Sequence, residues 1–297
     1  MKKTAFLLVI FSAILWGSSC LFVSWLTPYG ISGMGITTIR AIVSVLFIGL
    51  FMLVKDRSAL KVAPKKLLLL ALCGLALLGS SASYFTSIGL TSVATAVVLM
   101  YTAPVFVMLF SVAFLGEKMS VVKAISVLLM LGGCVFVSGI IGDASFHLGG
   151  ILLGLLAGVS FAAYNIFAKI VMKKEIGTLT ANFYTFLFMS LFGLVLCNPT
   201  HTFGIVGQNP MPMIPLLLLT GIVTGAVPYL MYAAALKHVP AGIAASLSVI
   251  EPMASVILGF ILLDQKITLL TVLGVVMIIV AVFLLAPRAS DKQKGNE

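Results

Sequence analysis

Charged side chains are scarce in this sequence. Only 9% of its 297 residues are Asp, Glu, Lys or Arg, whereas about a quarter of the residues of a soluble domain are charged. Hydrophobic residues make up 61% of the chain, and its mean hydropathy is +1.24. This composition excludes a soluble globular protein. It predicts an integral membrane protein whose spans leave no room for a soluble domain.

Catalytic motifs are missing as well. The sequence has no HExxH pattern for zinc, no GxSxG nucleophile elbow and no pair of acids inside the membrane. The only histidines fall in expected loops: His147, His201 and His238. We therefore expect neither an intramembrane enzyme nor a bound metal or other cofactor.

Cysteine is rare, and the spacing of the cysteines matches no disulfide or metal-binding pattern. The four residues are single, widely spaced and within or beside apolar runs, which predicts neither disulfides nor a metal site. They are Cys20, Cys73, Cys134 and Cys197. The formal net charge is +10, but the charges lie in short loops between apolar runs. Membrane topology explains such charges, so no nucleic-acid partner is expected.

Long apolar runs are what the sequence has in abundance, and about 20 apolar residues can cross a bilayer as a helix. The first run follows Met1, Lys2 and Lys3 in the manner of a signal peptide. It continues to Leu26 without a convincing cleavage site, so we expect a retained span. Ten spans are expected, at residues 4–26, 33–54, 67–88, 93–115, 121–140, 149–171, 179–197, 214–235, 242–263 and 267–286.

The distribution of basic residues tests this count, because Lys and Arg gather in cytoplasmic loops. Of 18 basic residues, only Lys266 falls in a loop of the other side and only Arg40 within a span, so 18 minus 2, or 16, share one side. That side is therefore expected to be the cytoplasm. With ten crossings, both termini are expected there.

The two halves of the chain resemble each other in spacing. Residues 79–90 and 225–236 each run from Gly to Leu, and residues 104–118 and 252–266 each run from a midspan Pro to a Lys. Five spans per half is an odd number, so the second half enters the membrane upside down. Such inverted repeats are typical of secondary transporters, whose substrate site lies where the halves meet.

The expected fold is therefore an all-α membrane protein with ten transmembrane helices in two inverted five-helix repeats. The first repeat is expected over residues 1–140. The second is expected over residues 141–297 and ends in a short cytoplasmic tail.

Glu251 is the strongest candidate for chemistry, because it lies in the middle of an expected span. A carboxylate at that depth costs roughly 2.5 to 3.5 kcal/mol on insertion scales. It could exchange a proton or hold the ammonium group of a substrate. The alternative is a structural acid paired with a buried cation or hydroxyl. Its counterpart in the first half is Ala103, so the site is chemically asymmetric.

Arg40 is the one cation expected inside a span, on the order of 10 Å from the outer surface at 1.5 Å per residue. It could snorkel outward or pair with Glu251, and we favour a structural or folding role for it. Phe186 occupies the matching place in the second half.

Three prolines fall well inside spans, where each is expected to kink its helix and to free a carbonyl four residues back. Such helices suit gating or ligand contacts, although proline is also tolerated in ordinary membrane helices. The prolines are Pro104, Pro228 and Pro252, and the freed carbonyls are those of Met100, Thr224 and Ser248.

Aromatic and amide side chains at middle depth are candidates for the wall of a substrate cavity, since ligand cavities combine apolar walls with a few polar groups. The alternative is packing between helices. These residues are Trp16, Tyr101, Tyr164, Asn165, Tyr229 and Tyr232.

Short motifs in the spans carry a resemblance to a known family. They are Trp16-Gly17-Ser18-Ser19, Arg40-Ala41, Pro104 followed by Leu115-Gly116-Glu117-Lys118, and Glu251-Pro252 followed by Leu262-Leu263-Asp264-Gln265-Lys266. With ten spans in two halves, the chain resembles the drug/metabolite transporter superfamily, EamA type. It departs from the family pattern at Asp264-Gln265, where Gly-Glu is frequent. The departure weakens a symmetric role for Glu117.

The resemblance implies a bacterial inner-membrane carrier, often an exporter of amino acids, related metabolites or toxic compounds. It also implies a central cavity lined by the first, third, fourth, sixth, eighth and ninth spans, with the fifth and tenth peripheral. The residues on these lining spans are Glu251, Pro252, Tyr101, Trp16, Asn165 and Tyr229.

We therefore expect a secondary active transporter that works by alternating access, as a monomer or homodimer in the bilayer. No GxxxxGK[ST] loop is present, so uphill transport has to draw on an ion gradient or on the solute's own gradient. Proton coupling through Glu251 is a further hypothesis. The alternatives are a non-transporting scaffold or subunit and a passive channel.

Overall fold

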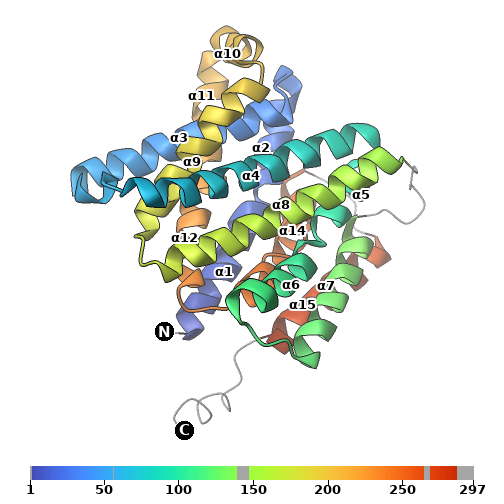
Figure 1. The fold of residues 1–297 in the computed structure, drawn as a ribbon. Helices are drawn as coiled ribbons and strands as arrows, with labels where there is room; N and C mark the ends of the chain where they lie inside the picture. Colours follow the sequence, from blue (N-terminus) through green and yellow to red (C-terminus); the bar gives the residue numbers. More distant parts are fainter. Residues whose placement is uncertain (1, 56, 139–146, 264–267, 286–297) are drawn as a thin grey trace.

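The computed structural model is a bundle of helices and describes residues 2–55, 57–138, 147–263 and 268–285 (Figure 1). The motif residues Asp264, Gln265 and Lys266 lie outside the described residues. In chain order the elements are α1 (Lys2–Gly17), α2 (Ser19–Leu26), η1 (Thr27–Tyr29), α3 (Gly33–Lys55), η2 (Arg57–Leu60), α4 (Pro64–Leu90), α5 (Val93–Met100), α6 (Ala103–Leu115), α7 (Val121–Ser138), α8 (Leu148–Lys173), α9 (Thr178–Leu196), α10 (Pro199–Gln208), α11 (Pro210–Leu219), η3 (Thr220–Ala226), α12 (Val227–Leu236), α13 (Ala241–Leu247), α14 (Ile250–Leu263) and α15 (Leu269–Leu285).

Eight helical stretches of the described chain are long and apolar enough to cross a membrane. They are Lys3–Tyr29, Gly33–Lys55, Pro64–Leu90, Thr95–Leu115, Leu148–Lys173, Thr178–Leu196, Pro210–Leu236 and Ala241–Leu263. The other two expected spans fall on the shorter apolar helices α7 and α15. The described residues thus give eight full-length spans where the sequence predicts ten.

Four of the long stretches are interrupted near their middle. The stretch Lys3–Tyr29 is divided at Ser18, Thr95–Leu115 at Tyr101 and Thr102, and Ala241–Leu263 at Ser248 and Val249. The stretch Pro210–Leu236 passes through η3, a π-helix, before α12 begins. In contrast, α3, α4, α8 and α9 are continuous.

The three prolines lie where the regular α-helix of a span is interrupted or changes to a π-helix, and their kinking role stays a prediction. Pro104 lies in the first turn of α6, where a helix needs no N–H donor. The carbonyl of Ser248 is not free either, because it accepts the N–H of Glu251 at 2.9 Å. Before Pro228 the wider π-helix accommodates the missing donor, and the Val227 N–H reaches the Ile222 carbonyl.

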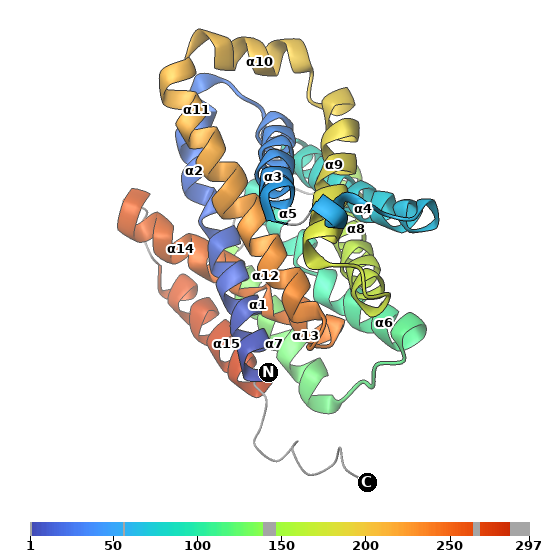
Figure 2. The same ribbon diagram turned by 90° about the vertical axis from the view of Figure 1, so that its left-hand side faces the viewer.

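The central helices form two groups that stand side by side in Figure 2. The α12 group consists of α1, α2, η3, α12, α13 and α14. The α8 group consists of α4, α5, α6 and α8. Each group is packed within itself, chiefly through α1 with α12 and α14 and through α8 with α4, α5 and α6. Helices α3 and α9 pack together and connect both groups, and α7 pairs with α15.

The two groups meet mainly at one end of the bundle, which we call the basic end because it carries Lys3, Lys55, Lys118, Lys173 and Lys237. Helix α13 packs against α6 and α8, and α12 packs against α8. Helices α2, α5 and α14 lie nearer the opposite end, and in the described chain they have no comparably close packing across the groups. The space between the groups is therefore closed at the basic end.

Helix α10 was not expected, because the sequence predicts a loop there. It lies at the opposite end from the start of α1 (Figures 1 and 2). The side chain of Asn198 caps its first turn by accepting the His201 N–H at 3.4 Å, and the Thr202 hydroxyl donates to the Cys197 carbonyl at 2.7 Å. His201 is thus helical, and the cause is this capping asparagine followed by Pro199.

The pairing of α7 with α15 depends on two glycines. A methyl group added to Gly274 would lie 2.6 Å from the carbonyl oxygen of Gly133. We expect Gly274→Ala to lower the free energy of unfolding by about 1–3 kcal/mol, because backbone has to move. Thermal unfolding in detergent measures this. The matched control is Gly204→Ala in α10, where nothing lies within 4 Å of the added group; an equal loss in both variants would contradict the prediction.

Candidate functional site

The break between α1 and α2 lies directly against α14. The Ser255 hydroxyl donates to the Gly17 carbonyl at 2.9 Å, which satisfies a group that the break sets free. A Cβ atom at Gly17 would lie 2.7 Å from both the Glu251 carbonyl oxygen and the Ala254 Cβ atom. Only glycine allows this approach. The Trp16-Gly17-Ser18-Ser19 motif therefore brings the first span against the first turn of α14.

Glu251 lies in that first turn of α14. A negative charge there is stabilised by the positive end of the helix dipole. The residue is half-buried, its carboxylate interacts with the hydroxyl of Tyr101, and Arg40 acts on it through its charge. The structure thus brings together Glu251, Tyr101 and Arg40 from the ninth, fourth and second expected spans.

Tyr84 on α4 also belongs to this site, although sequence reasoning missed it. Its half-buried ring is electrostatically coupled to Glu251 and to Tyr101. Cys20 on α2 lies against α14, where its thiol donates to the Ser255 carbonyl at 3.6 Å. No motif marks Tyr84, and only its middle depth in an expected lining span could have indicated it.

Arg40 is held by its stem and lacks a partner at one nitrogen. Its Cγ atom would lie 3.2 Å from a Cβ atom at Gly225, so the side chain passes close to η3. Its Nε atom is buried without a hydrogen-bond partner, as is Nε1 of Trp16. No direct ion pair joins Arg40 to Glu251 in the part of the chain described here. The opposite charges of Glu251 and Arg40 therefore lie around the same region as two unpaired donors, Nε of Arg40 and Nε1 of Trp16.

An aromatic cluster closes this region from the basic end. The Tyr229 ring centroid lies 4.9 Å from that of Trp16, 5.1 Å from that of Phe186 and 5.8 Å from that of Tyr164. Trp16 also lies 5.2 Å from Tyr232. Edge-to-face and tilted pairs at these distances pack favourably. The cluster joins α1, α8, α9 and α12 into one buried wall.

Asn165 and Tyr232 bond to each other in the depth of that wall. The Tyr232 hydroxyl donates to Oδ1 of Asn165, whose Nδ2 group donates to the Phe161 carbonyl at 2.7 Å. Both side chains are fully buried. The structure therefore places them inside the packing and not on an open cavity surface, because each supplies the partner that the other needs.

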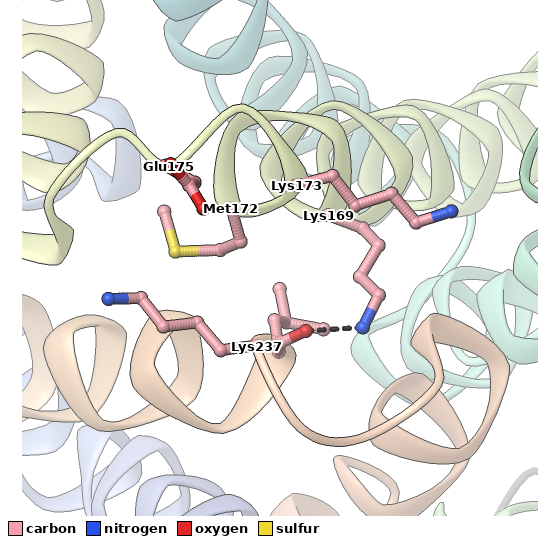
Figure 3. A pocket seen from close by; sticks show the side chains of 6 residues that line it. Lys169, Met172, Lys173, Glu175 and Lys237 are labelled. Atoms are coloured by element: carbon pink, nitrogen blue, oxygen red, sulfur yellow. Dashed lines mark hydrogen bonds between the residues drawn. The ribbon is translucent and has the colours of Figure 1, made fainter.

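A cavity of about 420 Å³ lies at the basic end between α8 and α12 (Figure 3). None of the site residues expected from sequence lines it. Lys169 reaches across from α8 to the end of α12 in this view. The lining residues are Lys169, Met172, Lys173, Glu175, Leu236 and Lys237. Among the described residues, no three His, Cys, Asp or Glu side chains gather into a metal site.

The sequence matches the model of the EamA-like transporter family over residues 3–139 and again over residues 148–286. The chain belongs to the EamA-like transporter family. It is a multi-pass membrane protein with two EamA repeats.

Similar chains share most of the length of this EamA-like protein. An uncharacterized transporter of Clostridium kluyveri is 30% identical over 257 residues, which cover 83% of this chain and 80% of that protein. The uncharacterized transporter YxxF of Bacillus subtilis is 25% identical over 295 residues, covering 98% and 92%. A crystal structure with a TM-score of 0.81 and 17% identity covers 99% of this chain and 100% of its own, and it shows the same fold.

The bond between Asn165 and Tyr232 predicts non-additive stability effects. Tyr232→Phe leaves a buried acceptor unsatisfied, so we expect the free energy of unfolding to fall by about 1–3 kcal/mol. Adding Asn165→Leu removes the second polar group, and the double variant is expected to lose less than the sum of the single variants. Unfolding of all three variants in detergent measures the coupling. Strict additivity would show that the two side chains do not depend on each other.

Proposed function

We propose that this chain is a secondary active transporter that exports small organic solutes, such as amino acids or related metabolites, across the cytoplasmic membrane by alternating access. The observation that carries the proposal is the separated pair Arg40 and Glu251, two opposite charges between the helix groups without a direct ion pair among the described residues. Unpaired charges are costly within a bilayer. A solute that meets both charges offsets that cost.

The proposed topology has ten spans in two inverted halves, residues 1–140 and 141–297, with both termini in the cytoplasm. The twofold match to the family model supports the halves. The gathering of 16 of 18 basic residues on one side supports the orientation. The basic end is then the cytoplasmic end, and α7 and α15 count as the fifth and tenth spans.

The described conformation fits the state that is open to the outside. The two helix groups pack chiefly through contacts of α13 with α6 and α8 and of α12 with α8, near the basic end. Glu251, Tyr84 and Cys20 keep part of their surface accessible and lie toward the opposite end. Rocking of the α12 group against the α8 group is the proposed transport motion, with α3 and α9 as the connection.

The polar groups of the site match a solute with an ammonium and an acidic group. The Glu251 carboxylate is an acceptor for the ammonium group. Nε of Arg40 and Nε1 of Trp16 are donors without partners, so they suit the acidic group. Tyr84 and Tyr101 would contact the remainder of the solute.

Glu251 is also the proposed site of proton coupling, because no second acid lies beside it in the described region.

Two other functions remain as alternatives, and reconstitution separates them. Proteoliposomes are exposed to amino acids, nucleosides, sugars and cationic drugs. A carrier gives saturable uptake and counterflow for one of these classes. A passive channel gives flux that does not saturate and no counterflow, and a scaffold gives no flux.

Glu251→Gln is the sharpest test of coupling. The amide cannot bind or release a proton, so we expect the dependence of transport on a pH gradient to disappear. The measurement is solute flux into proteoliposomes with and without an imposed gradient. The matched control is Glu175→Gln, an exposed acid at the basic end, which should retain the dependence. Retained dependence in Glu251→Gln would remove Glu251 from the coupling role.

A further inference from the structure

One short segment at the basic end, residues 236–242, is held by charged side chains of the other helix group. This α12–α13 turn contains the last residue of α12 and the first two of α13. Glu117, in the loop after α6, accepts the N–H of Ala241 at 2.7 Å and that of Gly242 at 3.4 Å. Both bonds cross from the α8 group to the α12 group.

Lys169 holds the same turn from α8. Its ammonium group donates to the carbonyl of Leu236 (Figure 3). It also donates to the carbonyl of Val239 at 2.8 Å. Lys169 is buried, and it interacts electrostatically with Glu117. A cation at the end of α12 and an anion at the start of α13 both have the sign that the helix dipoles favour. Bonds of this charged kind are stronger than neutral ones.

The start of α13 has no cap of its own. Pro240 precedes it and supplies no side-chain hydrogen bond, so its first N–H groups depend on Glu117. The matching helix start in the first half, α5, is different. There Ser92 accepts the Thr95 N–H at 3.1 Å within its own segment. One helix start is thus capped locally, and the other is capped across the gap between the groups.

We infer that Glu117 and Lys169 form a latch that keeps the basic end of the bundle closed, and that the latch has to release before the site around Glu251 can open to that end. The turn lies where α13 packs on α6 and α8, and a Cβ atom at Gly242 would lie only 3.1 Å from Cγ of Met108. Separation of the two groups at this end therefore requires these bonds to break. The inference rests on the proposed transport function for its purpose.

Cysteine labelling tests the latch without measuring transport. The first reporter is Ala244→Cys in α13, fully buried one turn from the latch, in a variant whose four native cysteines are replaced by serine. The second reporter retains only Cys20, which is partly accessible and lies toward the opposite end. A membrane-impermeant maleimide is applied to each side of oriented vesicles.

With Glu117→Ala, we expect the reaction at Ala244→Cys from the basic side to rise about 5-fold or more, while the reaction at Cys20 from the opposite side falls. Lys169→Met should act in the same direction. The matched control is Ser92→Ala, which removes the local cap of α5 and should leave Ala244→Cys unreactive.

Three results would overturn the latch. They are an unchanged rate at Ala244→Cys, a rise at both reporters that indicates general loosening, and an equal response to Ser92→Ala. Flux is measured separately on the wild-type chain. Opposite responses of the two reporters together with no flux would reject the transport function and retain the latch.

Discussion

Every backbone polar group inside a bilayer needs a partner within the protein, because hydrocarbon offers none. This constraint explains how the interrupted spans persist. At each interruption a nearby donor reaches a carbonyl: Ser255 to Gly17 at 2.9 Å, Thr102 to Leu99 at 2.6 Å, Ser44 to Gly221 at 3.0 Å, and the N–H of Glu251 to Ser248 at 2.9 Å. Three of these donors are hydroxyls. Small hydroxyl residues beside the breaks are therefore as important for the fold as the prolines.

The breaks also share a way of meeting neighbouring helices. Gly17 in the first span lies against the Glu251 carbonyl of the ninth, at 2.7 Å from an added Cβ atom. Gly158 in the sixth span lies against the Leu99 and Met100 carbonyls of the fourth, at 3.1 and 3.2 Å. If the halves are repeats of five spans, these two crossings join equivalent pairs of spans, although the contacts lie about one helical turn apart. A close approach of a glycine to backbone carbonyls in both places supports the proposed internal symmetry.

The sequence predicted the long helices well because apolar length is a property of each segment alone. It could not locate the division at Ser18, which depends on the hydroxyl of Ser255, more than 200 residues away in the chain. It selected Trp16, Tyr229, Tyr232 and Asn165 by depth, and the structure does bring them together. Depth does not distinguish a side chain that lines an open space from one bonded within the packing. Tyr84 was missed because neighbours from other spans give it its place.

The fold is repeated, but its chemistry is not. Glu251 has Ala103 as its counterpart, and Arg40 has Phe186. The helix start at α5 is capped by Ser92, whereas that at α13 depends on Glu117. If the chain works by alternating access, as proposed, two identical halves would give two equally stable arrangements, one open at each end. Contacts made in only one half would then make one arrangement more stable than the other, so the asymmetric residues would set which end is closed when no solute is bound.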